Sequence, residues 1–449
     1  MYKGISLDQA PPEDIPLRFF LSAPLFGVLA GLLVVWRGGD LFISNWNLET
    51  IAITHLLTLG WLAMVMFGAF YQMVPVLVGG SVPFIYFARM LHSLFAGGIA
   101  LFVAAFFVMN AGFFEISSSL FAVAAALLLF SILCFFLQLA MAVFKEKAND
   151  RPTVVAMRIS MICLLLTMLL GISFIGNLTA WWALPWDRVN MTGIHVTLGL
   201  FGWVGTLLMG VGFHMIPMFY LTPSFDLEQA YRILRLHSIS LLLIPISLYF
   251  DLGLGALIAS AIPGALAAII FVFTLMQLLG RRRRRIVDTT MRFWQSGIFL
   301  LPLSLLCLAA NQWILEARVL LLFGVLFILG YAVALTNGML YKIYPFILWF
   351  HRYSNLIGKV PVPLLQDLAP NKFSRKQWHS FTAAIALFTV GILWQDDLTL
   401  RVAGMTFALS SLWLFQNILR AYRMEVPEAP EEDPDMAKFM EMLKQKKPQ

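Results

Sequence analysis

The chain has 449 residues, of which 60% are hydrophobic and only 12% are charged, and its formal net charge is +7. A soluble globular protein carries about 25% charged residues, so this composition excludes an ordinary soluble enzyme or binding domain. We therefore expect an all-α polytopic membrane protein that contacts the lipid bilayer over most of its length.

Apolar runs, taken in chain order, predict about twelve transmembrane helices, because a helix needs roughly 20 apolar residues to cross a bilayer. The first run, at 18–37, follows a polar stretch that lacks the pattern of a cleavable signal peptide. The other runs lie at 51–76, 86–109, 113–144, 156–178, 190–220, 233–251, 254–279, 292–311, 317–347, 379–395 and 398–420.

Basic residues mark every second predicted loop, at 145–151, 232–235, 281–285 and 359–376. Lys and Arg in short loops favour the cytoplasmic face, so we expect a multi-pass protein of a bacterial-type inner membrane with both termini in the cytoplasm. The arginine run at 281–285 can also attract anionic lipid. A nucleic-acid partner is not expected, since no folded basic domain surrounds that run.

One short stretch occurs three times, as "GAFYQMVP" at 68–75, "GVGFHMIP" at 210–217 and "GMLYKIYP" at 338–345. An arginine that opens a helix and a His-Ser pair recur in the same order, at intervals of about 140 residues. The repetition predicts three parallel, pseudosymmetric four-helix units at 18–145, 146–285 and 286–421. A cytoplasmic segment at 1–17 and a cytoplasmic acidic tail at 422–449 flank them.

The repeated residues have structural interpretations. Glycine lets helices approach closely in lipid, and proline bends or ends a helix. The His-Ser histidines, His92, His237 and His379, are expected to cap free backbone groups at the cytoplasmic starts of their helices.

Two other histidines break the threefold pattern. His55 follows Arg18 by 37 residues and His195 follows Arg158 by 37, whereas the third unit offers Leu329. Both should lie in the outer half of their helices. An ionisable group inside a span is a candidate functional residue, and histidine is a common ligand of haem and copper. The alternative is that each ring only bonds to a neighbouring carbonyl.

His214 is a further candidate metal ligand. It aligns with Gln72 and Lys342, three residues before the repeated proline. This alignment favours a position that requires only a polar side chain.

The segments "PLRFFLSAPLFGVLAGLLVVW" and "HLLTLGWLAMVMFGAFYQMVPVLVGG", with the histidines of the second and sixth helices, resemble the NnrS family and the catalytic subunit (subunit I) of haem-copper oxidases. The resemblance implies twelve spans that hold haem and copper. It places His55 at the position of a ligand of low-spin haem and His195 at the position of a copper ligand.

The sequence also departs from the oxidase pattern. The seventh helix has no adjacent histidine pair at its outer end, the tenth has no histidine, and Gly199 stands four residues after His195. A binuclear haem-copper centre cannot be assembled from these residues. The arrangement that the resemblance leaves is one haem between His55 and His195, facing each other across the bundle.

These observations predict a membrane haem-binding protein in respiration or in the handling of nitric oxide and other nitrogen oxides. Its partners would be a small gas ligand and a membrane or periplasmic electron donor. A proton pump is not expected, because Glu115, Asp251, Asp396 and Asp397 all lie at predicted helix ends and no relay of intramembrane carboxylates remains. The alternatives are a transporter or metal-handling permease with the histidines as its sites, and a cofactor-free assembly subunit.

Overall fold

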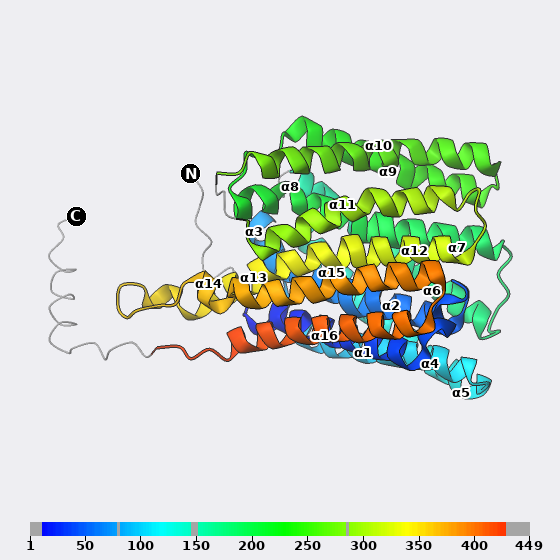
Figure 1. The fold of residues 1–449 in the computed structure, drawn as a ribbon, viewed down its shortest axis with the longest axis horizontal. Coiled ribbons are helices and arrows are strands. Elements are labelled where there is room, and N and C mark those ends of the chain that lie inside the picture. The colour runs from blue at the N-terminus through cyan, green and yellow to red at the C-terminus, as the bar shows by residue number, and fades with distance from the viewer. Residues whose placement is uncertain (1–10, 79–80, 145–150, 284–286, 428–449) are drawn as a thin grey trace.

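The chain forms a bundle of long helices that lie side by side (Figure 1). The computed structural model describes residues 11–78, 81–144, 151–283 and 287–427. Within these ranges, eleven helical rods are long and apolar enough to cross a membrane. A further rod, α15 at Asn371–Trp394, has a comparable length, but its first two turns carry Lys372, Arg375 and Lys376. The expectation of an all-α polytopic membrane protein is therefore confirmed.

Nine rods are single helices: α1 Asp14–Arg37, α4 Phe87–Asn110, α5 Phe114–Val143, α6 Pro152–Leu178, α9 Leu227–Tyr249, α10 Gly253–Gly280, α11 Thr289–Ala310, α15, and α16 Asp397–Tyr422. Short 3₁₀ turns η2 (Gly38–Phe42) and η6 (Ser354–Leu356) and the one-turn helix α14 (Leu365–Leu368) lie in the connections. Most of the predicted segments 1–17 and 422–449, and the end of the arginine run, lie outside the described residues.

The other three rods each contain a π-helical segment between two α-helices. They are α2 Leu48–His55, η3 Leu56–Ala63 and α3 Met64–Val78; α7 Arg188–Val196, η4 Thr197–Gly205 and α8 Thr206–Tyr220; and α12 Ala317–Gly324, η5 Val325–Val333 and α13 Ala334–Arg352. A π-helical segment widens a helix and often marks a functional site. The three segments begin about 20 residues before the repeated proline of their rod.

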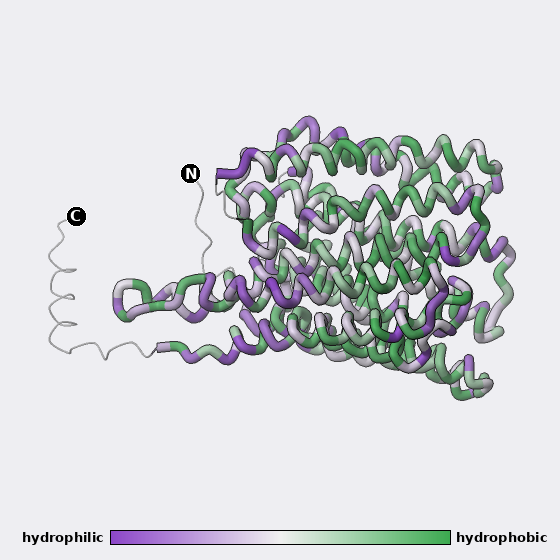
Figure 2. Tube along the Cα trace, in the orientation of Figure 1, coloured by the Kyte–Doolittle hydropathy of each residue, from purple (hydrophilic) through white to green (hydrophobic). Residues whose placement is uncertain are grey.

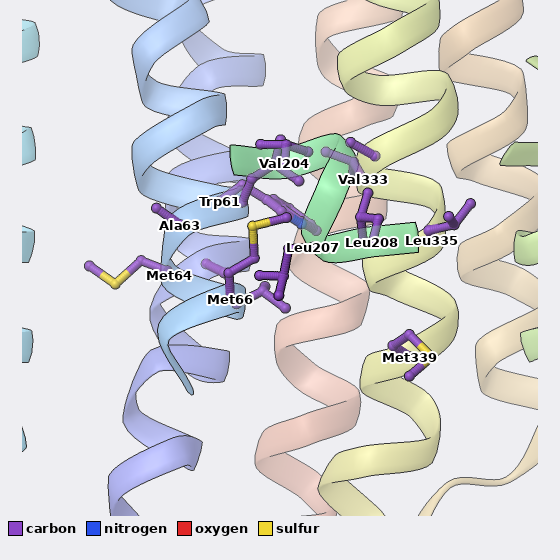
Figure 3. Close-up of a cluster of buried hydrophobic side chains, with 14 of the residues drawn as sticks. Trp61, Ala63, Met64, Met66, Val204, Leu207, Leu208, Val333, Leu335 and Met339 are labelled. Carbon is purple, nitrogen blue, oxygen red and sulfur yellow. The ribbon is translucent and has the colours of Figure 1, made fainter. Parts of the chain in front are cut away.

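These three rods form the interior of the bundle. Their most apolar stretches are 61%, 78% and 83% buried, against 22–44% for the other membrane-length rods. Trp61, Met66, Val204 and Leu207 gather where the rods meet (Figure 3). The rods that carry the repeated sequence are therefore shielded from lipid by the remaining helices.

The repeated glycines lie where helices pack closely, as the sequence predicts. A Cβ atom at Gly68 would lie 2.7 Å from the Phe20 ring, and one at Gly210 would lie 2.3 Å from the Ala156 methyl group. A Cβ at Gly338 would lie 2.9 Å from the Thr290 carbonyl. Each glycine thus lets an interior rod approach the helix that precedes it in the chain.

The His-Ser histidines do not cap helix starts, so that expectation is wrong. His92, His237 and His379 lie well inside α4, α9 and α15, beyond the first turn, where backbone N–H groups already have helical partners. His92 instead places its Nε2 atom 2.7 Å from the Ser22 hydroxyl of α1.

The start of α1 and the end of α16 lie at one end of the bundle, which we call the proximal end. Arg352 joins them, since its guanidinium lies 2.7 Å from the Glu13 carboxylate and also donates to the Tyr422 carbonyl. The other end is called the distal end. Polar residues concentrate toward the two ends, with a mostly hydrophobic zone between them (Figure 2).

Candidate functional site

A large internal cavity occupies the distal half of the bundle. Its volume is about 1100 Å³, and its walls are mostly aliphatic and aromatic side chains from the three interior rods and from α4, α5, α6, α9, α10 and α11. Three histidines, His55, His195 and His237, contribute to its lining. Among the described lining residues, Arg188 is the one with a permanent charge, and it lies at the distal start of α7.

Two of these histidines, His55 and His195, face each other. Their ring centres are 6.2 Å apart and their planes are inclined by 38°. A metal ion bound to one nitrogen of each ring, at about 2 Å, would hold the two ring centres about 6 Å apart. The rings thus have the separation that a shared metal requires.

The two histidines occupy equal depths in their rods. Each is the eighth residue from the distal start of its helix, α2 or α7, which places it roughly 10 Å inside. The eighth residue of the third rod is Gly324, and a Cβ atom there would meet nothing within 4 Å. Leu329, which the arginine spacing aligned with the histidines, lies five residues deeper in a wall of the same cavity.

His55 has a fixed orientation. Its Nδ1 atom lies 2.8 Å from the carbonyl oxygen of Ile51 in the preceding turn. Since a carbonyl only accepts hydrogen bonds, we assign the proton to Nδ1, which leaves the lone pair of Nε2 available to a metal. Phe102 meets the ring edge-on at 5.2 Å, and Phe106 stacks at 6.4 Å.

His195 is held less firmly. Its Nδ1 atom is buried and has no hydrogen-bond partner. The Thr167 carbonyl of α6 is close enough to interact with the ring, but it makes no well-formed bond to Nδ1. Phe174 packs edge-on at 5.6 Å, and a Cβ atom at Gly171 would lie 3.5 Å from Cε1. The ring is therefore positioned mainly by packing.

A buried carboxylate, Glu49, anchors the distal end of α2 and was not singled out in the sequence. It accepts a 2.6 Å hydrogen bond from Nε of Arg37 and a 3.0 Å bond from Nδ2 of Asn110. Asn47 caps the same helix through the backbone N–H of Glu49. These contacts tie α2 to α1 and α4, and so they help to position His55. A Glu in the first turn of a helix is too common a signal to reveal this network from the sequence.

His237 lies deeper in the cavity, near the middle of α9. Its Nε2 atom is 3.1 Å from the carbonyl oxygen of Phe201 and 3.0 Å from the hydroxyl of Thr206. Phe201 belongs to the π-helical segment η4, so His237 helps to satisfy a backbone group of that segment. The sequence places this histidine in a repeat but does not reveal that it reaches the cavity.

His214 does not join the other two candidates. It lies 19 residues beyond His195 on the same rod, roughly 28 Å along the axis, and it does not line the cavity. The aligned Gln72 is buried, and its Oε1 atom has no partner. All three polar positions therefore lie toward the proximal end, away from the histidine pair.

The third aligned residue, Lys342, forms an ion pair with Asp288, with Nζ 2.6 Å from Oδ2. Asp288 precedes α11 and caps it through the backbone N–H of Met291, and Thr290 also donates to it. Burial alone would raise the pKa of Asp288, but the ammonium of Lys342 and these hydrogen bonds hold its pKa below the usual value. This pair is a structural contact between α11 and α13.

The histidine pair suits a cofactor that brings its own ligands. Within the described residues, no three His, Cys, Asp or Glu side chains are grouped as a metal site. Zinc sites use three or four protein ligands, whereas a haem iron needs only axial ligands from the protein. The three cysteines are free thiols, and Cys163 is the one that is buried.

No protein-family model matches this chain, and no curated protein is similar to it.

Proposed function

We propose that this chain is a haem-binding membrane protein in which His55 and His195 are the axial ligands of one haem iron. The observation that carries the proposal is the 6.2 Å separation of the two rings inside a cavity of about 1100 Å³. A metal ion alone would need the histidines but not the space. The mostly apolar walls match the porphyrin, whose binding buries a large apolar surface.

The distal end of the cavity has polar groups for the haem carboxylates. Arg188 lies over the Trp46 ring at 5.5 Å, and Asn45 and Asn190 line the same region. The propionates would lie toward Arg188, where their charge is compensated and water is near. The apolar edge of the macrocycle would then lie deeper in the bundle.

The threefold architecture belongs to the same proposal. Three interior rods carry the repeated Gly-to-Pro stretch and a π-helical segment in the same order, and each repeated glycine packs against the rod that precedes it in the chain. We infer three pseudosymmetric units and a distant relationship to the NnrS family and to haem-copper oxidases. Both termini would then lie on the cytoplasmic side of a bacterial-type inner membrane.

His55 and His195 would hold the haem iron, and this pair would suit electron transfer in respiration. The less firmly held His195 is the residue whose absence would leave room for a small gas such as nitric oxide. Bound haem supplies one-electron redox chemistry. The protein contributes the fixed His55 ring, the apolar walls and the charge of Arg188.

The test is a pyridine haemochrome assay and an optical spectrum of the purified protein, beside His55→Ala, His195→Ala and the control His92→Ala. His92 is also buried in the bundle but lies outside the cavity. We expect about one haem per chain in the parent and control, and a loss or a changed spectrum in the two cavity variants. A well-folded protein without haem overturns the proposal. Bound copper in that protein would instead support a metal-handling permease.

A further inference from the structure

The cavity is lined on one side by α10 residues that are also exposed. Ile258, Ile262 and Ala265 line the cavity and are also exposed on the outer surface of α10, with Ile262 59% exposed. Their spacing of four and three residues places them on one face of the helix. Leu301 and Leu305 of α11 line the same cavity.

Side chains that both line the cavity and are exposed indicate an opening here, at a depth within the bilayer, which we call the α10–α11 slot. Its α10 residues are roughly 8–18 Å from the distal start of the helix, and the apolar core of a bilayer is about 30 Å thick. Because its walls are aliphatic, the slot admits molecules dissolved in the membrane rather than ions.

The cavity is slightly larger than a usual pocket for one ligand. A pocket for a single ligand typically has roughly 300–1000 Å³, and this cavity has about 1100 Å³. Its lining includes the histidine pair, His237 and the slot residues of α10. The part lined by α9, α10 and α11 is the part that a second ligand would occupy.

His237 provides the polar group for such a ligand. Its Nε2 atom lies 3.1 Å from the Phe201 carbonyl and 3.0 Å from the Thr206 hydroxyl, and that hydroxyl donates to the same carbonyl. Since both neighbours can then accept from Nε2, we assign the ring proton to it. Nδ1 then carries a lone pair and has no hydrogen bond within the described residues. The neighbouring Ser240 is already used, since it donates to the Ser260 carbonyl and accepts from the Gly264 N–H.

We propose that the α10–α11 slot binds a membrane-soluble hydroquinone, whose ring hydroxyl donates a hydrogen bond to Nδ1 of His237. The slot requires an apolar molecule, and the unprotonated Nδ1 atom of His237 requires a hydrogen-bond donor. A quinone has only acceptors and fits this nitrogen poorly. The inference rests on the proposed function, because the hydroquinone would lie beside the haem. Hydroquinone binding can nevertheless be measured in protein that contains no haem.

The experiment measures the amount of decylubiquinol retained per protein in nanodiscs, relative to empty nanodiscs. It is compared with decylubiquinone and with the dimethyl ether of decylubiquinol, which has no donor. We expect the hydroquinone to be retained about tenfold better than either analogue, since one hydrogen bond to a buried group is worth about 1.4 kcal/mol.

Two variants test whether the Nδ1 atom of His237 and the space in the slot are needed for binding, and a control variant tests for a general effect on folding. His237→Gln keeps an N–H near the Phe201 carbonyl and removes the Nδ1 acceptor, and Ala265→Trp fills the slot from outside. Both should lower hydroquinone retention about tenfold, whereas the matched control His92→Gln should not. Equal retention of all three compounds, or no effect of both variants, overturns the inference and assigns the slot to lipid acyl chains.

Haem content, measured on the same samples, distinguishes this result from the proposed function. Protein that binds hydroquinone but contains no haem would refute the haem proposal alone. Protein with haem and no hydroquinone preference would refute the slot proposal alone.

Discussion

The two axial ligands proposed for the haem should differ in strength, and this difference can be measured. His55 and His195 lie at equal depth, but the Nδ1 atom of His55 lies 2.8 Å from the Ile51 carbonyl oxygen, whereas the Nδ1 atom of His195 has no hydrogen-bond partner within the described residues. Such a bond fixes the ring and raises the basicity of the ligand nitrogen. The perturbation is therefore the pair of variants His55→Ala and His195→Ala, compared with each other.

The expected magnitude follows from the missing bond at His195. Loss of a partner behind a ligating histidine costs about 10–100-fold in metal affinity. Removing the anchored ligand should therefore weaken haem binding about 10–100-fold more than removing the unanchored one. His195→Ala should retain a five-coordinate haem, whereas His55→Ala should lose most of its haem.

The assay is a titration of haem-depleted protein with haemin, followed by the absorption spectrum, with carbon monoxide added to the reduced protein. His195→Ala should bind carbon monoxide readily because its iron has an open position. The parent should bind it slowly, since a histidine must first leave. Equal haem affinities for the two variants, or a stronger loss in His195→Ala, would refute the argument from the Ile51 hydrogen bond.

Three further predictions concern the scaffold. Both side-chain amide atoms of the fully buried Asn337 lack hydrogen-bond partners. Asn337→Leu should therefore stabilise the protein against thermal unfolding by about 1–3 kcal/mol. A loss of stability would instead show that the amide binds water or another group. Asp288 has a folded-state pKa below its unfolded value. The stability from its pair with Lys342 is therefore present above about pH 4 and is lost as the pH falls through the folded pKa. Asp288→Asn should remove this acid dependence of the unfolding free energy, and a variant with the parent's pH profile would contradict the prediction. A Cβ atom at Gly31 would lie 2.5 Å from the carbonyl oxygen of Gly404. Gly31→Leu should therefore push α1 away from α16 and lower the melting temperature by several degrees. Gly97→Leu is the control, because a Cβ atom at Gly97 would meet nothing within 4 Å.

Much of the fold follows from apolar periodicity, and some of the local roles do not. The runs at 113–144 and 254–279 predict α5 and α10 to within a few residues, because about 20 apolar residues leave few alternatives in lipid. The three π-helical segments leave no such signal, since a change in backbone hydrogen bonding does not alter composition.

In the candidate site, too, the sequence predicts some features and not others. Repeat spacing singles out His55 and His195 because they interrupt a pattern, but it cannot give the distance between two helices, which depends on how their neighbours pack. The sequence predicts that His237 is a capping residue, because a His-Ser pair near a helix start resembles a cap. The structure places it eleven residues into α9, where its partner is a carbonyl of another rod. Contacts between distant segments of this kind are not visible in one sequence.

Under the haem proposal, two of the three repeated rods supply a histidine and the third does not. The rings of His55 and His195 close the space between the first and second rods. The third rod meets that space with Gly324, which leaves it open, and with Phe323 and Phe327, which pack against Phe201. A histidine in the third rod would fill the volume that connects the pair to His237 and the α10–α11 slot. Gly324→His should accordingly reduce hydroquinone retention while leaving haem content unchanged. Reduced haem content with unchanged hydroquinone retention would show that the third rod borders the haem itself.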